Sequence, residues 1–181
     1  MKKTTIVIGV TGGIACYKAA DLVSSLVKKG FDIHVIMTEN AVEFITPLTF
    51  QTLSGNQVAT SMFERITSFE VEHISLAQRA DVFVVAPASA NFIGKMAHGI
   101  SDDMLTTTIM ATKAPVVIAP AMNTAMWENP ILKDNLEKLK RFGVQVVEPD
   151  EGRLACGDIG KGKLAEVEKI VEEIGKVVRF K

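Results

Sequence analysis

The chain has 181 residues, of which 48% are hydrophobic and 23% charged, and its formal net charge is −1 at pH 7. That length suits one domain that buries a substantial core, and the near-neutral charge argues against a nucleic-acid-binding protein, which usually presents a basic face. The two cysteines, Cys16 and Cys156, lie far apart and outside any CxxC pair, so the sequence predicts neither a zinc site nor a disulfide framework. We expect both thiols to be reduced.

The amino-terminal stretch MKKTTIVIGVTGGIAC has the lysines and the apolar run of a signal peptide. The run covers only residues 4–10, however, and Gly12 and Gly13 interrupt it, which places it at the short limit for a signal peptide. Its valines and isoleucines suit a buried strand better. Because no apolar stretch in the sequence is long enough to span a bilayer, we expect a cytoplasmic protein with no membrane partner.

Short runs of β-branched residues alternate with longer segments of helical periodicity along the chain. The predicted strands cover residues 4–10, 32–37, 81–87, 114–121 and 144–149, and the predicted helices lie within residues 14–30, 39–55 and 164–178. Strands such as TIVIGV and VFVVA are apolar at every position, which is typical of strands buried on both faces. The sequence therefore predicts one α/β domain over residues 1–181: a doubly wound, Rossmann-like or flavodoxin-like parallel sheet with helices on both faces.

In open parallel sheets, ligands bind beyond the carboxyl ends of the strands. Here those ends are residues 11–13, 38–40, 87–91 and 120–123, which are rich in glycine, hydroxyl and amide groups. They predict a nucleotide-like ligand. The chain contains neither GxGxxG after its first strand nor GxxxxGK[ST], which argues against a common dinucleotide-binding protein and against a P-loop ATPase.

Two motifs at these strand ends each allow a structural and a functional interpretation. In PASAN, Ser89 either caps a helix or adds its hydroxyl to an anion site at the helix start. In APAMNTAMW, Asn123 stands between two methionines near the only tryptophan, which either pack in the core or form an apolar wall for a flat aromatic ring. The Gly12–Gly13 turn is similarly either a tight turn or an anion site.

A third motif, GRLACGDIGKGKLAE at residues 152–166, places Cys156 in a loop with four glycines, where few side chains can pack around a structural cysteine. Together and in this order, the three motifs resemble those of the homo-oligomeric flavin-containing cysteine decarboxylases. The resemblance covers nearly the whole chain and is greatest to the phosphopantothenoylcysteine decarboxylases of coenzyme A biosynthesis. Phe92 stands where that family usually has threonine, and Gly12–Gly13 where it often has Gly-Ser. Since many bacterial members carry a fused ligase, the chain is expected to be a stand-alone form.

The resemblance implies an enzyme that decarboxylates 4′-phosphopantothenoylcysteine to 4′-phosphopantetheine with FMN and without a metal. In that reaction the cysteine thiol is oxidised to a thioaldehyde, which makes loss of the carboxylate easy. The ene-thiol that remains is then reduced by the same flavin. The resemblance also implies a homotrimer, or an assembly of trimers, with each flavin at a subunit interface.

Three catalytic residues follow from the resemblance. His73 would help to deprotonate the substrate during oxidation, and Asn123 would bind the substrate carboxylate or amide through its neutral side chain. Cys156 would donate a proton to the ene-thiol from a mobile clamp, a role that suits a free thiol at neutral pH.

The remaining expectations concern binding and structure. The expected flavin contacts are Gly12, Gly13, Ile14, Thr38, Ser89, Ala90, Asn91, Phe92 and Ala121. Lys161 and Lys163 are candidates for holding the substrate phosphate. His34, His98 and Cys16 match no motif and are expected to be structural.

Three alternatives stay open. A peptidyl-cysteine decarboxylase of lantibiotic maturation shares the histidine and the asparagine but lacks the clamp cysteine. A flavin prenyltransferase shares the fold but not PAMNTAMW, and a non-catalytic flavin-binding regulator of a phosphatase typically lacks one catalytic partner. The joint presence of His73, Asn123 and Cys156 favours the coenzyme A enzyme.

Overall fold

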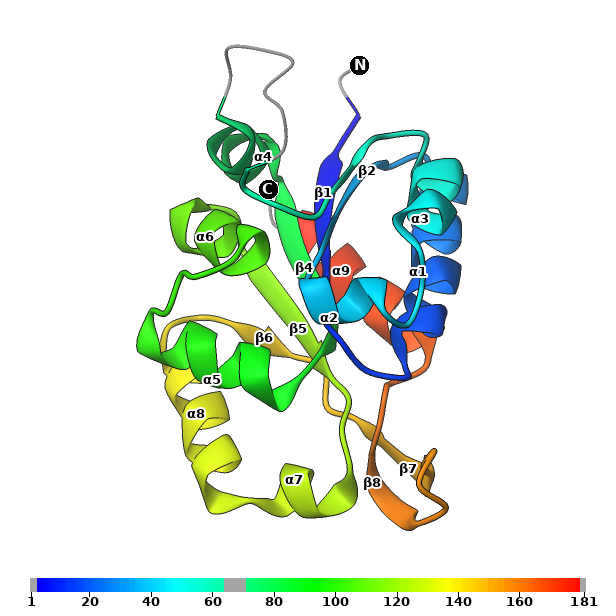
Figure 1. Cartoon of the computed structure of the whole chain (residues 1–181), viewed down its shortest axis with the longest axis vertical. Coiled ribbons are helices and arrows are strands. Elements are labelled where there is room, and N and C mark those ends of the chain that lie inside the picture. Colours follow the sequence, from blue (N-terminus) through cyan, green and yellow to red (C-terminus); the bar gives the residue numbers. More distant parts are fainter. Residues whose placement is uncertain (1–2, 64–70, 180–181) are drawn as a thin grey trace.

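The computed structural model describes residues 3–63 and 71–179, so residues 1–2, 64–70 and 180–181 of the predicted domain lie outside the described part. In that part, six parallel strands form one sheet in the order β3-β2-β1-β4-β5-β6 (Figure 1). Their bounds are β1 (Thr5–Val10), β2 (Asp32–Met37), β3 (Val58–Ala59), β4 (Val82–Ala88), β5 (Val116–Pro120) and β6 (Gln145–Val146). The predicted doubly wound sheet is confirmed, and its strand order reverses between β1 and β4.

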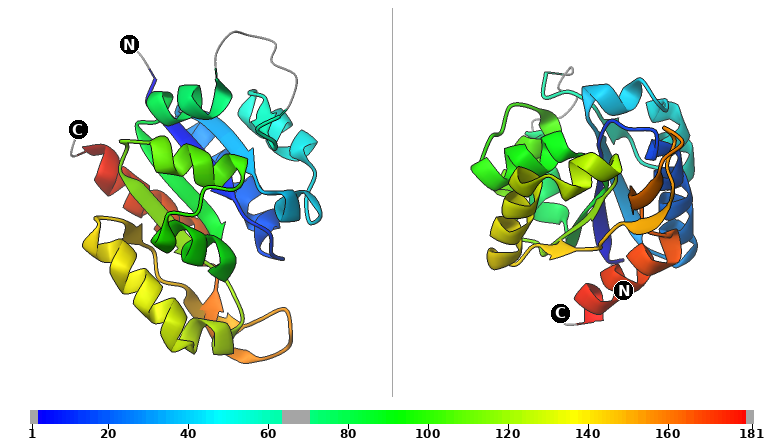
Figure 2. Two further views of the ribbon diagram at one scale, coloured as in Figure 1. Left: turned by 60° about the vertical axis from the view of Figure 1, so that its left-hand side comes forward. Right: turned by 90° about the horizontal axis from the view of Figure 1, so that it is seen from below.

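Helices cover both faces of this sheet, as predicted (Figures 1 and 2). Their bounds are α1 (Cys16–Lys28), α2 (Glu39–Val42), α3 (Pro47–Ser54), α4 (Glu72–Arg79), α5 (Ala90–His98), α6 (Met104–Ala111), α7 (Thr124–Glu128), α8 (Pro130–Arg141) and α9 (Val167–Arg179). In β1, Ile6 and Ile8 pack with α1, α3 and α9 on one face, whereas Val7 packs with α4, α5, α6 and α8 on the other. None of the helices described is both long enough and apolar enough to cross a membrane.

Several predicted boundaries differ from the observed ones. The helical segment 39–55 divides into α2 and α3, because Pro47 fits the first turn of a helix and not its interior. The predicted strand 144–149 pairs over two residues only, and β3 is too short to show a periodic pattern. Part of the glycine-rich motif forms an antiparallel hairpin of β7 (Asp150–Arg153) and β8 (Ile159–Lys163).

The residues expected to be structural have structural partners. Cys16 is buried, and its Sγ donates a hydrogen bond to the Thr11 carbonyl oxygen at 3.0 Å. This burial raises the pKa of the Cys16 thiol. His34 Nε2 lies 3.2 Å from Asp32 Oδ2, and His98 Nδ1 lies 2.9 Å from a carbonyl oxygen of its own helix.

The β7–β8 hairpin is held against the loop that follows β5 (Figure 1). The Met122 N–H donates to the Gly162 carbonyl oxygen at 2.9 Å. Gly162 has a φ of +148°, and a Cβ there would overlap the Met122 carbonyl oxygen. A Cβ on Gly160 would lie 2.6 Å from Thr124 Oγ1. Glycines at these two positions therefore let the hairpin approach the β5–α7 loop closely.

A second contact ties the base of the hairpin to α9. Asp150 Oδ1 accepts from Lys169 Nζ, and Asp150 Oδ2 accepts from the Glu166 N–H, both at 3.0 Å. Burial alone would raise the pKa of the Asp150 carboxyl, but these two hydrogen bonds and the charges of Lys169 and Lys163 together lower it. The tip of the hairpin therefore extends from a base that is fixed on two sides.

We predict that Gly162→Ala lowers the free energy of unfolding by about 1–3 kcal/mol, because alanine is strained at this φ and its Cβ displaces the β5–α7 loop. The control is Gly152→Ala on β7, where a Cβ would make an ordinary 3.4 Å contact with Lys163 Cδ; its effect should stay within about 0.5 kcal/mol. Urea unfolding curves measure both. Equal losses in the two variants would show that the close approach at Gly162 does not hold the hairpin.

Candidate active site

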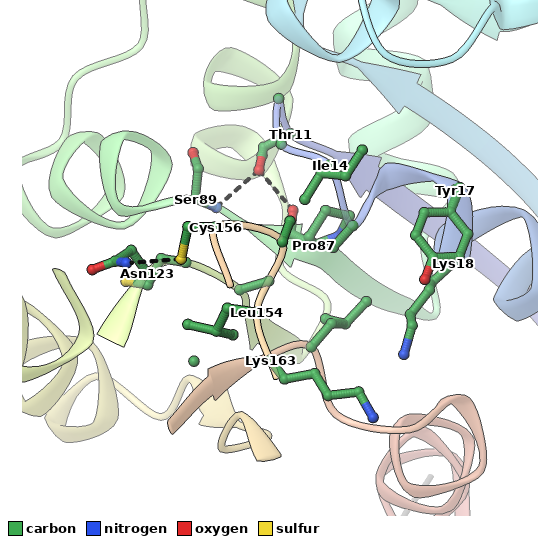
Figure 3. A pocket seen from close by; sticks show the side chains of 18 of the residues that line it. Thr11, Ile14, Tyr17, Lys18, Pro87, Ser89, Asn123, Leu154, Cys156 and Lys163 are labelled. Carbon is green, nitrogen blue, oxygen red and sulfur yellow. Dashed lines mark hydrogen bonds between the residues drawn. The ribbon is translucent and has the colours of Figure 1, made fainter. Parts of the chain in front are cut away.

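A cavity of about 530 Å³ lies at the carboxyl ends of β1, β4 and β5, facing the β7–β8 hairpin (Figure 3). It is lined by residues 11–15, 17–18, 87, 89, 121–123, 153–156 and 162–164. Among these are five of the expected flavin contacts: Gly12, Gly13, Ile14, Ser89 and Ala121. The cavity is therefore at the edge of the sheet where the sequence predicts a ligand.

Thr11 joins the ends of β1 and β4 beneath this cavity. Its buried Oγ1 donates to the Pro87 carbonyl oxygen at 2.7 Å and accepts from the Ser89 N–H at 2.8 Å (Figure 3). The Thr11 N–H also donates to the Pro87 carbonyl oxygen, at 3.3 Å. These bonds fix the first-strand turn relative to the start of α5, and they satisfy polar groups that would be costly to bury without partners.

The turn between β1 and α1 contains two glycines with different surroundings. A Cβ on Gly12 would lie 2.4 Å from Asn40 Cβ, so this position needs glycine to pack against the start of α2. A Cβ on Gly13 would meet nothing within 4 Å. The backbone at Gly13 therefore faces open space at the amino terminus of α1, a 13-residue helix, where an anion is favoured.

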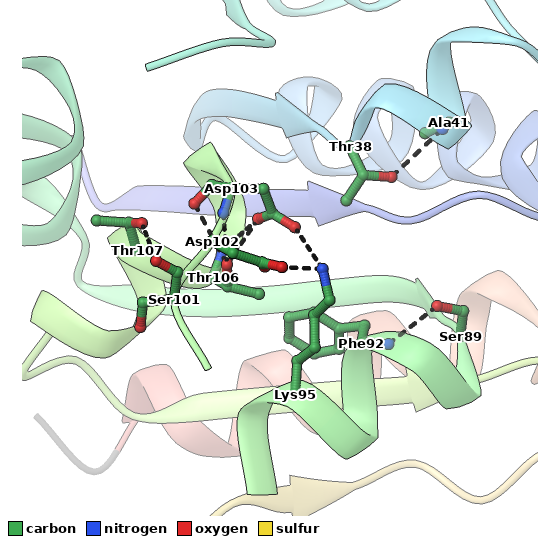
Figure 4. Close-up of polar contacts among 10 residues, drawn as sticks. All are labelled: Thr38, Ala41, Ser89, Phe92, Lys95, Ser101, Asp102, Asp103, Thr106 and Thr107. Carbon is green, nitrogen blue, oxygen red and sulfur yellow. Dashed lines mark hydrogen bonds and ion pairs between the residues drawn. The ribbon is translucent and has the colours of Figure 1, made fainter. Parts of the chain in front are cut away.

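The other four expected flavin contacts do not line the cavity: Thr38, Ala90, Asn91 and Phe92. Thr38 caps α2, with its Oγ1 accepting from the Ala41 N–H at 3.3 Å (Figure 4). Phe92 is buried, and its N–H donates to Ser89 Oγ at 3.2 Å, so Ser89 also has the predicted role of a helix cap. Asn91 is exposed. Flavin contacts at these four positions stay predictions.

Charged groups fix the loop between α5 and α6 (Figure 4). Lys95 Nζ lies 2.7 Å from Asp102 Oδ1 and 3.6 Å from Asp103 Oδ2. The hydrogen bond to Asp102 raises the pKa of Lys95 and lowers that of Asp102. Asp103 and Thr106 form a capping box at the start of α6. These contacts hold α5 and α6 together on the face of the sheet behind the cavity.

Two of the three expected catalytic residues meet at the cavity. Asn123 caps α7: its Oδ1 accepts from the Ala125 N–H at 2.8 Å. Its Nδ2 donates to Cys156 Sγ at 3.4 Å, the contact drawn in Figure 3, and to Asp158 Oδ2 at 3.3 Å. Cys156 Sγ in turn donates to Asp158 Oδ2 at 3.3 Å. The sequence analysis does not identify Asp158, although it lies only two positions after the cysteine in the same motif.

His73, the third expected catalytic residue, is elsewhere. It is half-buried near the start of α4, and it does not line the cavity. In both views α4 lies at the end of the sheet opposite the β7–β8 hairpin (Figures 1 and 2). One chain therefore does not bring His73 to Asn123 and Cys156.

The two lysines expected to bind phosphate point to different places. Lys163 lines the cavity and forms a 2.6 Å hydrogen bond with Glu166 Oε1, which raises the pKa of the lysine. Lys161 does not line the cavity; it pairs with Glu148, and this hydrogen bond lowers the pKa of Glu148.

Three polar residues of the cavity wall are missing from the sequence analysis. They are Tyr17, Lys18 and Arg153. Lys18 lies 3.7 Å from Glu166, so it shares that carboxylate with Lys163. Its place one helical turn after the glycine turn is the sequence signal that could identify it.

The described residues contain no group of three or more histidine, cysteine, aspartate or glutamate side chains able to hold a metal ion. The groups that this cavity does contain are an amide, a thiol, a carboxylate and two lysines, set against an apolar wall. This set can bind an anionic ligand, orient a carboxylate and supply a proton, and it resembles an active site that relies on an organic cofactor.

Comparisons with known proteins agree with this description. The flavoprotein family profile matches residues 1–179. The coenzyme A biosynthesis bifunctional protein CoaBC of Bacillus subtilis is 50% identical over 95% of this chain, but the chain spans only 42% of that relative. A probable phosphopantothenoylcysteine decarboxylase of Streptococcus mutans is 44% identical over 93% of this chain and 96% of its own length.

Solved structures give the same result. A cysteine-to-serine mutant of PPC decarboxylase, complexed with pantothenoylaminoethenethiol, has a TM-score of 0.84 and 32% identity, covering 97% of this chain and 98% of its own. The FMN-dependent cysteine decarboxylase SpaF has a TM-score of 0.86 and 31% identity, covering 98% and 96%. The chain belongs to the flavoprotein family, and its relatives there include FMN-dependent cysteine decarboxylases.

Proposed function

We propose that this chain is an FMN-dependent decarboxylase that converts 4′-phosphopantothenoylcysteine to 4′-phosphopantetheine in coenzyme A biosynthesis. The observation that carries the proposal is the contact between Asn123 Nδ2 and Cys156 Sγ, 3.4 Å apart at a cavity on the carboxyl edge of the sheet. An amide that can hold a carboxylate and a thiol that can supply a proton are the two groups this reaction needs from the protein. The relatives named for this activity support the same conclusion.

The cavity has the features that FMN requires. Ile14, Met122 and Leu154 contribute apolar surface for a flat ring. The backbone at Gly13 is open beside the amino terminus of α1, which suits a phosphate. Lys18 and Lys163 add positive charge on the same wall. When bound here, FMN would supply a reversible acceptor for two electrons and a hydrogen from the sulfur-bearing carbon of the substrate.

The protein would orient the substrate and handle protons. The Ala125 N–H holds Asn123 Oδ1, so Nδ2 is directed away from the α7 backbone and can donate to the substrate carboxylate. A neutral donor suits this task, because a lysine in its place would stabilise the charged carboxylate that has to leave. Cys156 would donate its proton to the carbon from which CO₂ has departed.

His73 would complete the site from a neighbouring subunit. Within one chain it lies near α4, away from the cavity, whereas Val71 and Ile74 beside it are apolar and exposed. Exposed apolar side chains on both sides of a catalytic histidine suit an interface between subunits. We therefore propose a homotrimer, or an assembly of trimers, in which α4 of one subunit approaches the cavity of the next.

The enzyme would work in the cytoplasm. Both cysteines are free, and Cys156 is exposed at the tip of the hairpin. An exposed thiol that must remain reduced for catalysis suits a reducing compartment.

The first prediction concerns the cofactor. The purified protein should be yellow and should release FMN, not FAD, on denaturation. Gly13→Asp should weaken FMN binding by about tenfold or more, because it places a negative charge at an anion site. Gly13→Ala is the matched control, since its Cβ meets nothing within 4 Å. Fluorescence titration of the apoprotein measures both. A colourless protein that does not bind FMN would contradict the proposal.

The second prediction concerns the product. Mass spectrometry should show 4′-phosphopantetheine and CO₂ from 4′-phosphopantothenoylcysteine, and no change in a cysteine-ended peptide present as a competitor. Cys156→Ser should retain FMN but accumulate the oxidised, decarboxylated ene-thiol, because the proton donor for the last step is missing. Decarboxylation of the peptide instead would support the peptidyl-cysteine alternative. Normal phosphopantetheine from Cys156→Ser would show that Cys156 is not the donor.

The third prediction concerns the shared site. His73→Asn and Asn123→Asp should each be inactive alone. When the two variants are unfolded, mixed and refolded together, roughly a quarter of the interfaces in random cyclic oligomers should carry both intact side chains. We therefore expect activity to return in the mixture. No recovery, with mixed oligomers verified by native mass spectrometry, would place both residues in one subunit.

A further inference from the structure

Asp158 has no role in the mechanism above, yet it contacts both catalytic side chains of the cavity. Its Oδ2 accepts from Asn123 Nδ2 and from Cys156 Sγ, each at 3.3 Å. The β7–β8 hairpin therefore presents a carboxylate to the same amide that would bind the carboxylate of the substrate.

The amide of Asn123 has too few donors for both carboxylates. A primary amide nitrogen carries two hydrogens, and here Nδ2 donates to Cys156 Sγ and to Asp158 Oδ2. The side chain cannot turn to offer more, because the Ala125 N–H holds its oxygen at 2.8 Å. Two carboxylates that share one amide would also repel each other. A substrate carboxylate on Nδ2 therefore has to displace Asp158.

Asp158 and Cys156 would leave and return together. The Leu154 N–H donates to the Asp158 carbonyl oxygen at 2.8 Å, and the Gly157 N–H donates to the Leu154 carbonyl oxygen at 2.9 Å. These two bonds close the tip of the hairpin into one turn that carries both the carboxylate and the thiol. Displacement of Asp158 from Asn123 therefore also moves the Cys156 sulfur.

We infer that Asp158 is a positioning residue that replaces the substrate carboxylate on Asn123 after CO₂ has left and thereby brings the Cys156 thiol to the carbon that has lost the carboxylate. The inference rests on the proposed function. It explains the order of the two half-reactions: while the carboxylate occupies Asn123, the thiol is kept away, and once the carboxylate is gone, the tip docks. The observed contacts are those of the docked state.

The step that follows balances. The ene-thiol gains one proton from Cys156 on the carbon next to the lost carboxylate, and it regains on the sulfur-bearing carbon the hydride removed in the first step. The carbon–carbon double bond becomes a single bond, and the resulting Cys156 thiolate recovers a proton from water. Asp158 remains an ionised carboxylate throughout, so it acts through Cys156 and Asn123 and not on the substrate.

The test uses the FMN-loaded oligomer with Asp158→Asn and Asp158→Ala. We expect the ratio of ene-thiol to phosphopantetheine to rise about tenfold, the scale of one charge-assisted hydrogen bond lost from the reductive step. The rate of CO₂ release should stay within about twofold of the wild type. Asp158→Glu should restore part of the normal ratio, because it keeps a carboxylate. Glu151→Gln, which makes the same charge change on an exposed residue of the same hairpin, is the control and should leave the ratio unchanged.

A binding measurement tests the competition without turnover. The serine analogue of the substrate keeps the carboxylate but has no thiol to oxidise. Calorimetry should show that it binds about tenfold more tightly to Asp158→Asn and Asp158→Ala than to the wild type, because its carboxylate no longer competes with another. The affinity for phosphopantetheine, which has no carboxylate, should not change.

The two proposals fail in different ways. If the product ratio is unchanged in an otherwise active Asp158 variant, the inference is wrong while the proposed function stands. Equal losses of CO₂ and of phosphopantetheine would also overturn it, since a merely structural role lowers both. If the wild type releases no CO₂ from 4′-phosphopantothenoylcysteine, the proposed function itself is wrong.

Discussion

The backbone hydrogen bond from Met122 to Gly162 is the contact on which the arrangement of the cavity depends, because it joins the hairpin to the loop that follows β5. Without this docking, Cys156 would lie on a solvent-exposed loop far in sequence from Asn123. Gly162 permits the approach, since its positive φ and missing side chain leave room for the Met122 carbonyl. A single close backbone contact thus places two separate segments on one cavity.

The rest of the cavity is built on the sheet. Parallel strands that end at one edge bring the turns after β1, β4 and β5 together, and Thr11 connects the first two of these turns through buried hydrogen bonds. The helices on both faces make this edge rigid. The hairpin, in contrast, has an exposed tip with small residues, which suits a part that opens and closes. The site therefore combines a fixed floor with a movable cover.

The same polar groups can serve different partners in turn. Asn123 holds its own helix through Oδ1 and offers Nδ2 to the hairpin. In the proposed reaction, Nδ2 passes from Asp158 to the substrate carboxylate and back as the carboxylate is lost. Glu166 similarly lies between Lys18 and Lys163, which are free to turn to a phosphate only if they release it. Each exchange would make ligand binding and closure of the hairpin depend on each other.

The sequence by itself determined the fold class, the buried β1 and β4, and the strand ends where the cavity lies, because apolar runs and glycine turns are local patterns that depend on neighbouring residues only. It also identified Asn123 and Cys156, through motifs. It did not reveal β3 or the hairpin, since two-residue strands and glycine-rich strands carry no periodic signal. Tertiary structure alone decided that Asp158 bridges Asn123 and Cys156, that Lys163 faces the cavity while Lys161 pairs with Glu148, and that His73 lies away from both catalytic partners. These are relations between side chains distant in sequence, and they exist only once the chain has packed.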